Sequence, residues 1–212
     1  MATDSKSFLD WLARWEQGLP EVKLEETVSD PHRVALVSVD LTRGFCCEGP
    51  LASPRVAGVI PAVVRLFQRA RDLGVRHFLL MHDTHDADAL ELKALPFSDR
   101  FVVMPKNSIS CDLGTDLGPW LEAHPAVSRF IVVGDCTDIC VYLAAMYLRL
   151  RANVFRLRDV RVVIPADCVQ TYDMPVQVAE ELGGLPHDGD LLHRVFLYHM
   201  ALNGIEVAGH LA

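Results

Sequence analysis

The sequence lacks the segments that carry a chain into or across a membrane. None of its apolar runs reaches the roughly 18 residues of a membrane-spanning helix. Its first residues, MATDSKSFLDWLARWEQGL, do not place an apolar run after a basic start, as a secretory signal does. We therefore expect a cytoplasmic protein that does not bind membranes.

Positive charge is also scarce. The formal net charge is −8, which argues against nucleic acid as a partner because phosphate binding needs a basic face. Among the 20 basic residues, lysine occurs only at Lys6, Lys23, Lys93 and Lys106. A lysine kept in a chain that otherwise uses arginine is a candidate for a chemical role.

The six cysteines do not form the repeated CxxC pairs of a zinc site. In a chain of this length without a secretory signal, we expect them to be reduced thiols. They are Cys46, Cys47, Cys111, Cys136, Cys140 and Cys168.

Short apolar runs alternate with amphipathic segments along 212 residues, half of which are hydrophobic. This alternation predicts an α/β fold, a three-layer α-β-α sandwich around a mostly parallel, doubly wound sheet. We expect residues 1–30 to form a helical extension and residues 31–212 to form one domain. The expected strands are 33–40, 75–81, 101–104, 129–133, 160–164 and 205–208, and the expected helices are 7–19, 60–73, 116–123, 139–151 and 190–202.

Polar residues stand where several of these strands end. They are Asp40, Asp83 with His85, Lys106, and the loop leading to Cys140. Ligands of such sheets bind beyond the carboxyl ends of the strands. An acid, a lysine and a cysteine can therefore meet in one crevice.

Cys140 is the candidate nucleophile of that crevice. We expect Thr137 or Asp138 to cap the following helix, so that the helix dipole and a nearby Lys106 lower the pKa of the Cys140 thiol. Asp40 could then accept the thiol proton. By spacing alone the alternative is more common: a small buried cysteine, an acidic cap and a solvated lysine.

Three segments resemble the motifs of the isochorismatase-like cysteine hydrolases in order and separation: VSVDLTRGF (37–45), VMPKNSIS (103–110) and VVGDCTDICV (132–141). The resemblance runs from about residue 33 to 175. It implies that Asp40 is the general base, Lys106 the catalytic lysine and Cys140 the nucleophile of a hydrolase that cleaves an amide through a thioester.

The same resemblance implies a cis peptide bond between Asp135 and Cys136. The backbone N–H groups of Cys136 and Cys140 would then form an oxyanion hole. Cys136 itself is expected to be part of the pocket wall rather than a reagent.

Nicotinamidases within this family hold a divalent metal, and the matching positions here are Asp83, His85 and Glu91. Such ligands suit zinc, iron or manganese. The final histidine of the motif is replaced by Ser98, which argues for weak binding or none, and no organic cofactor is expected. Phe45 and Leu95 match positions beside the substrate ring.

Other branches of the family remain open. A carbamoyl or ureido amidase could use Arg43 to hold a substrate carboxylate, and an isochorismatase-type hydrolase or a catalytically silent ligand-binding protein would share the fold. The family also implies a homodimer or homotetramer and a small-molecule amide substrate. The histidines His187, His193 and His199 are expected at the surface or an interface.

Overall fold

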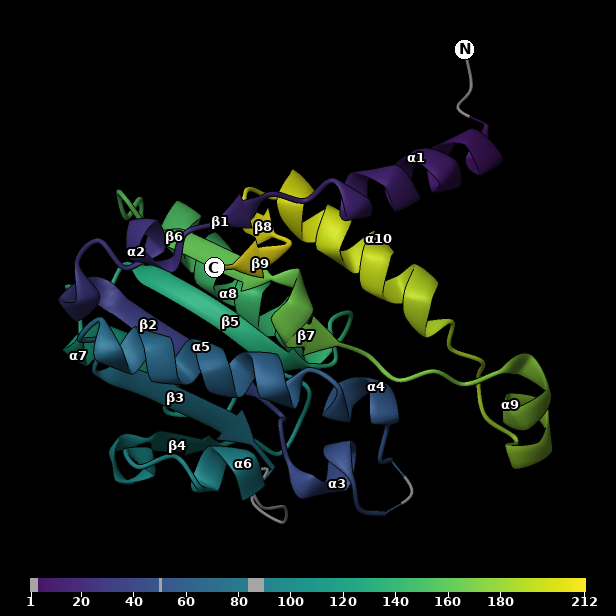
Figure 1. Cartoon of the computed structure of the whole chain (residues 1–212), viewed down its shortest axis with the longest axis horizontal. Helices are drawn as coiled ribbons and strands as arrows, with labels where there is room; N and C mark the ends of the chain where they lie inside the picture. Colours follow the sequence, from purple (N-terminus) through teal and green to yellow (C-terminus); the bar gives the residue numbers. More distant parts are fainter. Residues whose placement is uncertain (1–3, 50, 84–89) are drawn as a thin grey trace.

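A parallel sheet runs through the centre of the molecule. The computed structural model describes residues 4–49, 51–83 and 90–212. The sheet has the order β4-β3-β2-β5-β6-β8, and β7 also pairs with β5 (Figure 1). Every pairing in it is parallel. The strands are β2 (Val34–Val39), β3 (His77–His82), β4 (Val102–Pro105), β5 (Arg129–Asp135), β6 (Arg161–Pro165), β7 (Val169–Gln170) and β8 (Glu206–Ala208).

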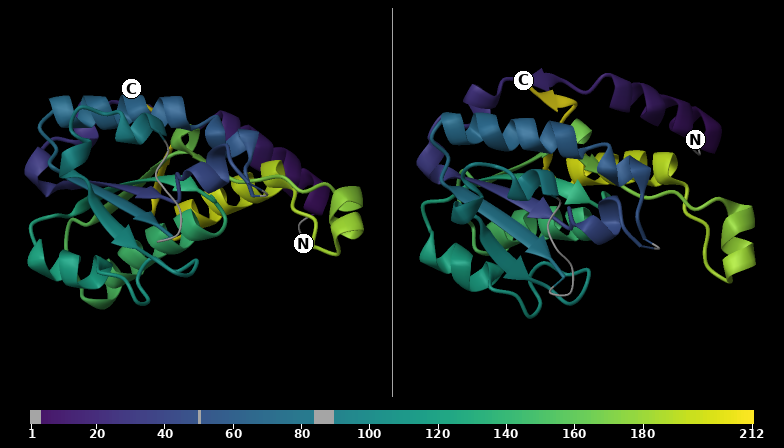
Figure 2. Two further views of the ribbon diagram at one scale, coloured as in Figure 1. Left: turned by 90° about the horizontal axis from the view of Figure 1, so that it is seen from below. Right: turned by 60° about the horizontal axis from the view of Figure 1, so that its bottom comes forward.

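Helices cover both faces of the sheet, as Figure 2 shows from two further directions. α5 (Ile60–Asp72) covers one face, and α7 (Leu117–Ala123), α8 (Cys140–Val154) and α10 (Gly189–Leu202) cover the other. The expected three-layer sandwich is therefore confirmed. The shorter helices are α2 (Leu24–Thr27), α3 (Arg43–Cys46), α4 (Pro54–Ala57), α6 (Leu90–Lys93) and α9 (Val176–Leu182), with 3₁₀ turns at Pro31–Arg33, Ser98–Arg100 and Ala166–Cys168.

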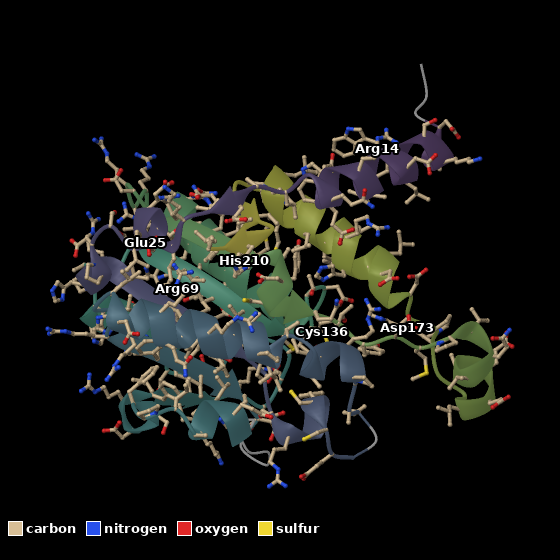
Figure 3. All side chains as sticks on the ribbon, viewed as in Figure 1. Arg14, Glu25, Arg69, Cys136, Asp173 and His210 are labelled. Carbon is tan, nitrogen blue, oxygen red and sulfur yellow. The ribbon has the colours of Figure 1, made fainter. Side chains whose placement is uncertain are left out.

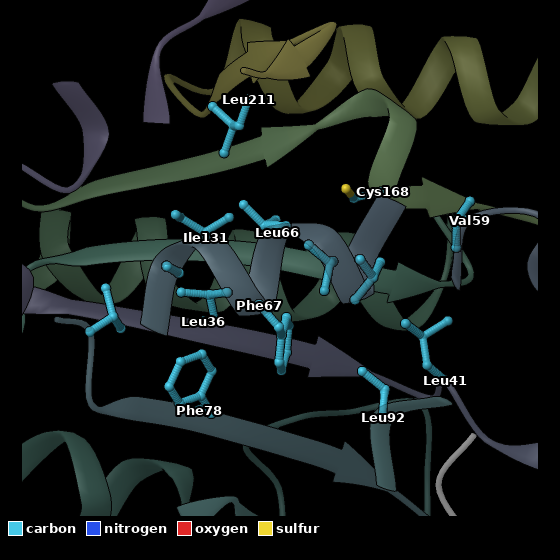
Figure 4. Packing of buried hydrophobic residues seen from close by; sticks show 14 of the residues in the cluster. Leu36, Leu41, Val59, Leu66, Phe67, Phe78, Leu92, Ile131, Cys168 and Leu211 are labelled. Atoms are coloured by element: carbon cyan, nitrogen blue, oxygen red, sulfur yellow. The ribbon is translucent and has the colours of Figure 1, made fainter. Parts of the chain in front are cut away.

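Burial on both faces explains why the strand sequences are continuously apolar. All six residues of β2 are buried, and successive side chains alternate between the two layers: Leu36 packs on the α5 side and Val37 on the α8 side. Figure 4 shows the α5 side, where Phe67 packs on Phe78 with ring centroids 5.3 Å apart. This double packing keeps the strand ends, and the polar residues that follow them, in fixed positions.

The N-terminal segment packs against the C-terminal part of the chain. α1 (Ser5–Gln17) contacts α10, where the ring of Trp15 lies edge-on to Tyr198. β1 (Glu21–Val22) then pairs in parallel with β9 (His210–Leu211). The predicted boundary near residue 30 stays a prediction.

Close packing of β2 on β5 requires glycine at position 134. Gly134 has a φ of +123°, and a Cβ there would overlap the backbone carbonyl of Val39. The two central strands can therefore lie close together at the carboxyl edge of the sheet, where Asp40 follows β2 and Asp135 is the last residue of β5.

Among the helices in the described ranges, none combines the length and the apolar character that crossing a bilayer demands.

Candidate active site

Three side chains from separate strand ends meet at the carboxyl edge of the sheet. Asp40 follows β2, Lys106 follows β4, and Cys140 is the first residue of α8. The Lys106 Nζ lies 2.6 Å from Asp40 Oδ2 and 3.7 Å from Cys140 Sγ. All three residues are buried. The convergence predicted from the strand ends is thus present in the structure.

Backbone hydrogen bonds to β3 continue one residue past the ends of β2 and β4, and they fix the positions of Asp40 and Lys106. Asp40 N donates to Met81 O at 2.8 Å, and Lys106 N donates to His82 O at 2.9 Å. Asp40 has a φ of +52°, the left-handed region that few residues other than glycine adopt. Lys106 Nζ also donates to Ser108 O at 3.0 Å. Both side chains are therefore held from the backbone as well as by each other.

Asp40 and Lys106 form a buried ion pair. Burial raises the pKa of Asp40, and the Lys106 charge and a hydrogen bond from Cys140 act against this rise. For Lys106, burial lowers the pKa, but the Asp40 carboxylate outweighs burial and the net shift is upward. The lysine therefore stays charged, while the carboxyl group is more basic than an exposed one.

The pKa of Cys140 is raised, contrary to the expectation from the helix dipole and Lys106. Burial is the largest cause and the Asp40 charge the second, and together they outweigh the lowering by Lys106. The resting group is therefore a thiol hydrogen-bonded to Asp40 rather than a free thiolate. Such a thiol can become a nucleophile by passing its proton to Asp40 as it reacts.

The other thiols near the site are also protonated. Burial raises the pKa of Cys111 to about 12 and raises the pKa of Cys136 further. Cys140 differs in that its sulfur lies 3.7 Å from Lys106 Nζ, which forms the ion pair with Asp40. All six cysteines are free thiols, in line with the expectation from the sequence.

A cavity of about 570 Å³ opens in front of Cys140. Most of its lining is apolar, and the predicted Phe45 is part of it. Leu95, by contrast, is buried in the core on the α5 side and is not among the described residues that line the cavity. The lining residues are Asp40, Phe45, Leu51, Ala52, Ser53, Pro54, Arg55, Val56, Ile109, Asp135, Cys136, Ile139, Cys140, Tyr172, Asp173 and Met174.

The loop between β5 and α8 contains the expected cis peptide bond between Asp135 and Cys136. Figure 3 shows Cys136 at the edge of the sheet and Asp173 where the chain leaves toward α9. Burial raises the pKa of Asp135 to about 7. Asp135 thus adds a weakly acidic carboxyl group to the same cavity. The motifs assigned this residue only to the cis peptide bond and gave its side chain no role.

The predicted cap of α8 is wrong. The residue before the helix is Ile139, which provides no side-chain cap. Thr137 Oγ1 instead lies 2.8 Å from His193 Nδ1, and Asp138 Oδ2 lies 2.8 Å from His187 Nε2. The two side chains expected to cap α8 are therefore hydrogen-bonded to histidines from later in the chain.

Those histidines correct a second expectation. His187 and His193 are buried, whereas His199 is exposed as expected. Burial lowers the pKa of His193 to about 4. Only the path of the chain between β7 and α10 brings these two histidines to the loop that precedes α8.

Two of the three predicted metal ligands, Asp83 and Glu91, lie within the described residues. Asp83 is half-buried, and Glu91 is exposed beside a separate cavity with Cys46 and Cys47. His85 lies outside the described residues. Ser98 Oγ donates to Lys93 O at 3.0 Å, so its hydroxyl closes a turn of its own segment. In the ranges that the structure covers, no group of three or more His, Cys, Asp or Glu could hold a metal ion.

Arg43 forms an ion pair with Glu48 and is not among the described residues that line the cavity. Arg55 does line it, and no sequence motif predicted this. Its guanidinium donates to Asp190 Oδ1 at 2.6 Å and to Thr171 O at 3.1 Å. If any arginine approaches a bound ligand, the geometry favours Arg55.

Comparison with known proteins agrees with the motifs. The family model for the isochorismatase domain matches residues 34–180. Nicotinamidase 1 of Arabidopsis thaliana is 35% identical over 214 residues, covering 84% of this chain and 86% of the relative.

Solved structures share the fold. The nicotinamidase from Staphylococcus aureus has a TM-score of 0.59 at 21% identity, covering 82% of this chain and 98% of the other. N-carbamoylsarcosine amidase from Thermoplasma acidophilum has a TM-score of 0.60 at 19% identity, covering 83% and 95%. The domain model and the plant relative go further than the fold: the protein belongs to the isochorismatase family and is a hydrolase that acts on non-peptide C–N bonds.

Proposed function

We propose that the protein is a cysteine amidohydrolase of the nicotinamidase type, which releases ammonia from a small aromatic amide. The observation that carries the proposal is the contact of Lys106 Nζ with both Asp40 Oδ2 and Cys140 Sγ. The plant relative, itself named a nicotinamidase, supports the substrate class.

In the first half of the reaction, the Cys140 thiol passes its proton to Asp40 and its sulfur bonds to the amide carbon. The carbonyl oxygen becomes an oxyanion. Asp40 then returns the proton to the amide nitrogen, the C–N bond breaks, and ammonia leaves a thioester on Cys140. Lys106 keeps its positive charge and stabilises the ionised forms of both neighbours.

In the second half, Asp40 removes a proton from water, whose oxygen attacks the thioester carbon. The C–S bond breaks, the thiolate of Cys140 takes the proton back, and the carboxylic acid leaves. One amide and one water are consumed, and one acid and one ammonia are formed. Asp40 and Cys140 end in their starting protonation states.

The oxyanion would be bound by the backbone N–H groups of Cys136 and Cys140. Cys140 is the first residue of α8, where N–H groups have no partner within the helix. Both residues line the cavity, so a carbonyl oxygen can reach them. Such donors typically contribute about 3 kcal/mol each to transition-state stabilisation.

Aromatic and apolar side chains favour a flat ring as the rest of the substrate. Phe45, Tyr172 and Met174 line the cavity together with Cys140. Stacking on aromatic faces contributes about 1 kcal/mol per ring beyond the burial of area. A pyridine carboxamide satisfies both the amide chemistry and this wall.

Ammonia release from a panel of amides tests the proposal. The panel contains nicotinamide, pyrazinamide, an N-carbamoyl amino acid, ureidoacrylate and biuret, and we expect turnover of the two ring amides. Turnover restricted to the carbamoyl or ureido compounds would contradict the substrate class and make Arg55 the residue to test for carboxylate binding. No turnover at all would contradict the amidohydrolase.

We expect protein purified without a chelator to contain less than one equivalent of zinc, iron or manganese. The reason is that serine stands in place of the final histidine of the motif at position 98, where its hydroxyl donates to Lys93 O. Elemental analysis by mass spectrometry measures the metal content. A full equivalent in the wild type that is lost in His85→Ala would show that a metal site is present after all. No step of the proposed reaction runs through a metal.

The proposal includes a homodimer or homotetramer that works in the cytoplasm. Large apolar side chains are exposed in and just after α9, with Leu182 at 72% and Leu185 at 87%. Sedimentation velocity should give a mass at least twice that of one chain, and Leu182→Lys with Leu185→Lys should reduce it. A monomer at micromolar concentration would contradict this part.

A further inference from the structure

The inference concerns residues 171–188, here called the strap, and it rests on the proposed function. After β7 the chain leaves the sheet, and Figures 1 and 2 show α9 apart from the sheet and the helices that cover it. The two legs of the strap are joined by backbone hydrogen bonds between Met174 and His187, at 2.8 and 2.9 Å. The first leg supplies Tyr172, Asp173 and Met174 to the cavity wall. Whatever fixes this leg therefore shapes the substrate site.

His187 connects that leg to the loop of the nucleophile. Its Nδ1 lies 2.9 Å from Tyr172 O, and its Nε2 lies 2.8 Å from Asp138 Oδ2. Its ring also stacks on the ring of Tyr172, with centroids 3.9 Å apart and planes 17° apart. Asp138 stands two residues before Cys140 on the same loop. One buried imidazole thus bridges the wall and the nucleophile loop.

The partners of His187 occupy both of its ring nitrogens. A backbone carbonyl only accepts hydrogen bonds, so Nδ1 donates to Tyr172 O. Nε2 faces the carboxylate of Asp138, whose side chain is buried like that of His187. The imidazole thus spans the space between the strap and the nucleophile loop with a contact at each end.

The neighbouring acids do not compete for this role. Asp173 Oδ1 accepts from Gly189 N at 2.9 Å, and Asp188 Oδ1 accepts from Leu191 N at 2.9 Å. Asp135 and Cys136 act on the Tyr172 phenol from the β5 side. Arg55 also contacts the strap, donating to Thr171 O at 3.1 Å and to Asp190 Oδ1 at 2.6 Å.

We propose that His187 is a positioning residue: through its two hydrogen bonds and its stacking on Tyr172 it holds the Tyr172 wall at a fixed distance from the Cys140 loop and so sets the fit of the substrate ring. It is not among the described residues that line the cavity and has no part in the covalent steps. Its loss should therefore weaken substrate binding far more than it slows the chemistry.

Steady-state kinetics with nicotinamide test this role. His187→Gln removes the ring that stacks on Tyr172 and spans the two hydrogen-bond partners, and we expect KM to rise about tenfold while kcat changes less than about threefold. The matched control is His199→Gln, because His199 is an exposed histidine of the same region, with its Nδ1 3.0 Å from the Tyr142 hydroxyl. Wild-type KM in His187→Gln would overturn the proposal.

Variants of Asp138 test the same link if His187→Gln does not fold. In Asp138→Asn, the side-chain amide can still donate a hydrogen bond to Nε2 while Nδ1 donates to Tyr172 O, so the link is kept. Asp138→Ala cannot form it. We expect KM to rise in Asp138→Ala and to recover in Asp138→Asn. Equal KM values in the two variants would overturn the proposal.

The tautomer of His187 provides a readout that a merely structural role would not move. Nitrogen-15 NMR of the protein without substrate should show a proton on Nδ1, the atom that lies 2.9 Å from Tyr172 O, in the wild type and in Asp138→Asn. A proton on Nε2 alone would contradict the link.

The NMR measurement needs no turnover. The absence of turnover across the whole amide panel would therefore contradict the proposed function, while the NMR measurement would still decide whether His187 forms the link.

Discussion

Replacing Cys140 with alanine is expected to lower kcat/KM for the amide substrate by about 10⁴-fold or more, because the covalent route then has no nucleophile. Cys140 is the thiol within reach of both Lys106, at 3.7 Å, and the hydrogen-bonding carboxyl group of Asp40. Water activated by Asp40 could attack the amide directly, but only at the small residual rate of an enzyme without its nucleophile. Ammonia release measures the loss.

Cys111→Ala is the matched control for this prediction. Cys111 is buried like Cys140, and its sulfur lies 3.8 Å from the Cys140 carbonyl oxygen, but burial keeps it protonated. We expect its kcat/KM to stay within about fivefold of the wild type, since only packing changes. Equal loss of activity in both variants would show that alanine disturbs the region rather than removing a nucleophile.

Replacing Lys106 with methionine is expected to lower the free energy of unfolding by about 3–5 kcal/mol, because it leaves the Asp40 carboxylate buried without its partner. The pair is 2.6 Å apart, and both side chains are at most 5% exposed. Methionine keeps most of the volume of the lysine stem, so the change is chiefly one of charge. Urea unfolding at neutral pH measures it.

The pH dependence of that loss provides the check. Burial already raises the pKa of Asp40, and without Lys106 the rise is larger. A group whose pKa is raised by folding binds its proton more tightly in the folded state, so folding gains stability as pH falls. The deficit of Lys106→Met should therefore shrink below neutral pH, and Asp40→Asn with Lys106→Met should be more stable than Lys106→Met alone. A deficit independent of pH would contradict the buried ion pair.

The sequence predicted the sheet and the meeting of polar strand ends from local signals, whereas the roles of the three central residues came from the motifs that resemble the family. Continuous apolar runs such as Val34–Val39 are typical of strands buried on two faces, and the structure has them. Asp40, Lys106 and Cys140 each follow such a run or open the next helix. The parallel order of the strands then brings these positions to one edge of the sheet.

The features that sequence reasoning missed depend on contacts between distant parts of the chain. The raised pKa of Cys140 comes from its depth of burial and from Asp40, one hundred positions earlier. His187 and His193 reach the loop of Thr137 and Asp138 only because the strap returns to the sheet before α10. Leu95 is in the core because its side chain packs in the hydrophobic cluster on the α5 side of the sheet. The periodicity of apolar residues along the sequence does not predict such contacts.

The most direct test of the account is to find the acyl group. The protein is mixed with nicotinamide, quenched with acid during turnover, digested and mapped by mass spectrometry. The account predicts an added nicotinoyl group on the peptide that contains Cys140, and its absence in Cys140→Ala. An acyl group on another cysteine, or continued ammonia release by Cys140→Ala at the wild-type rate, would contradict it.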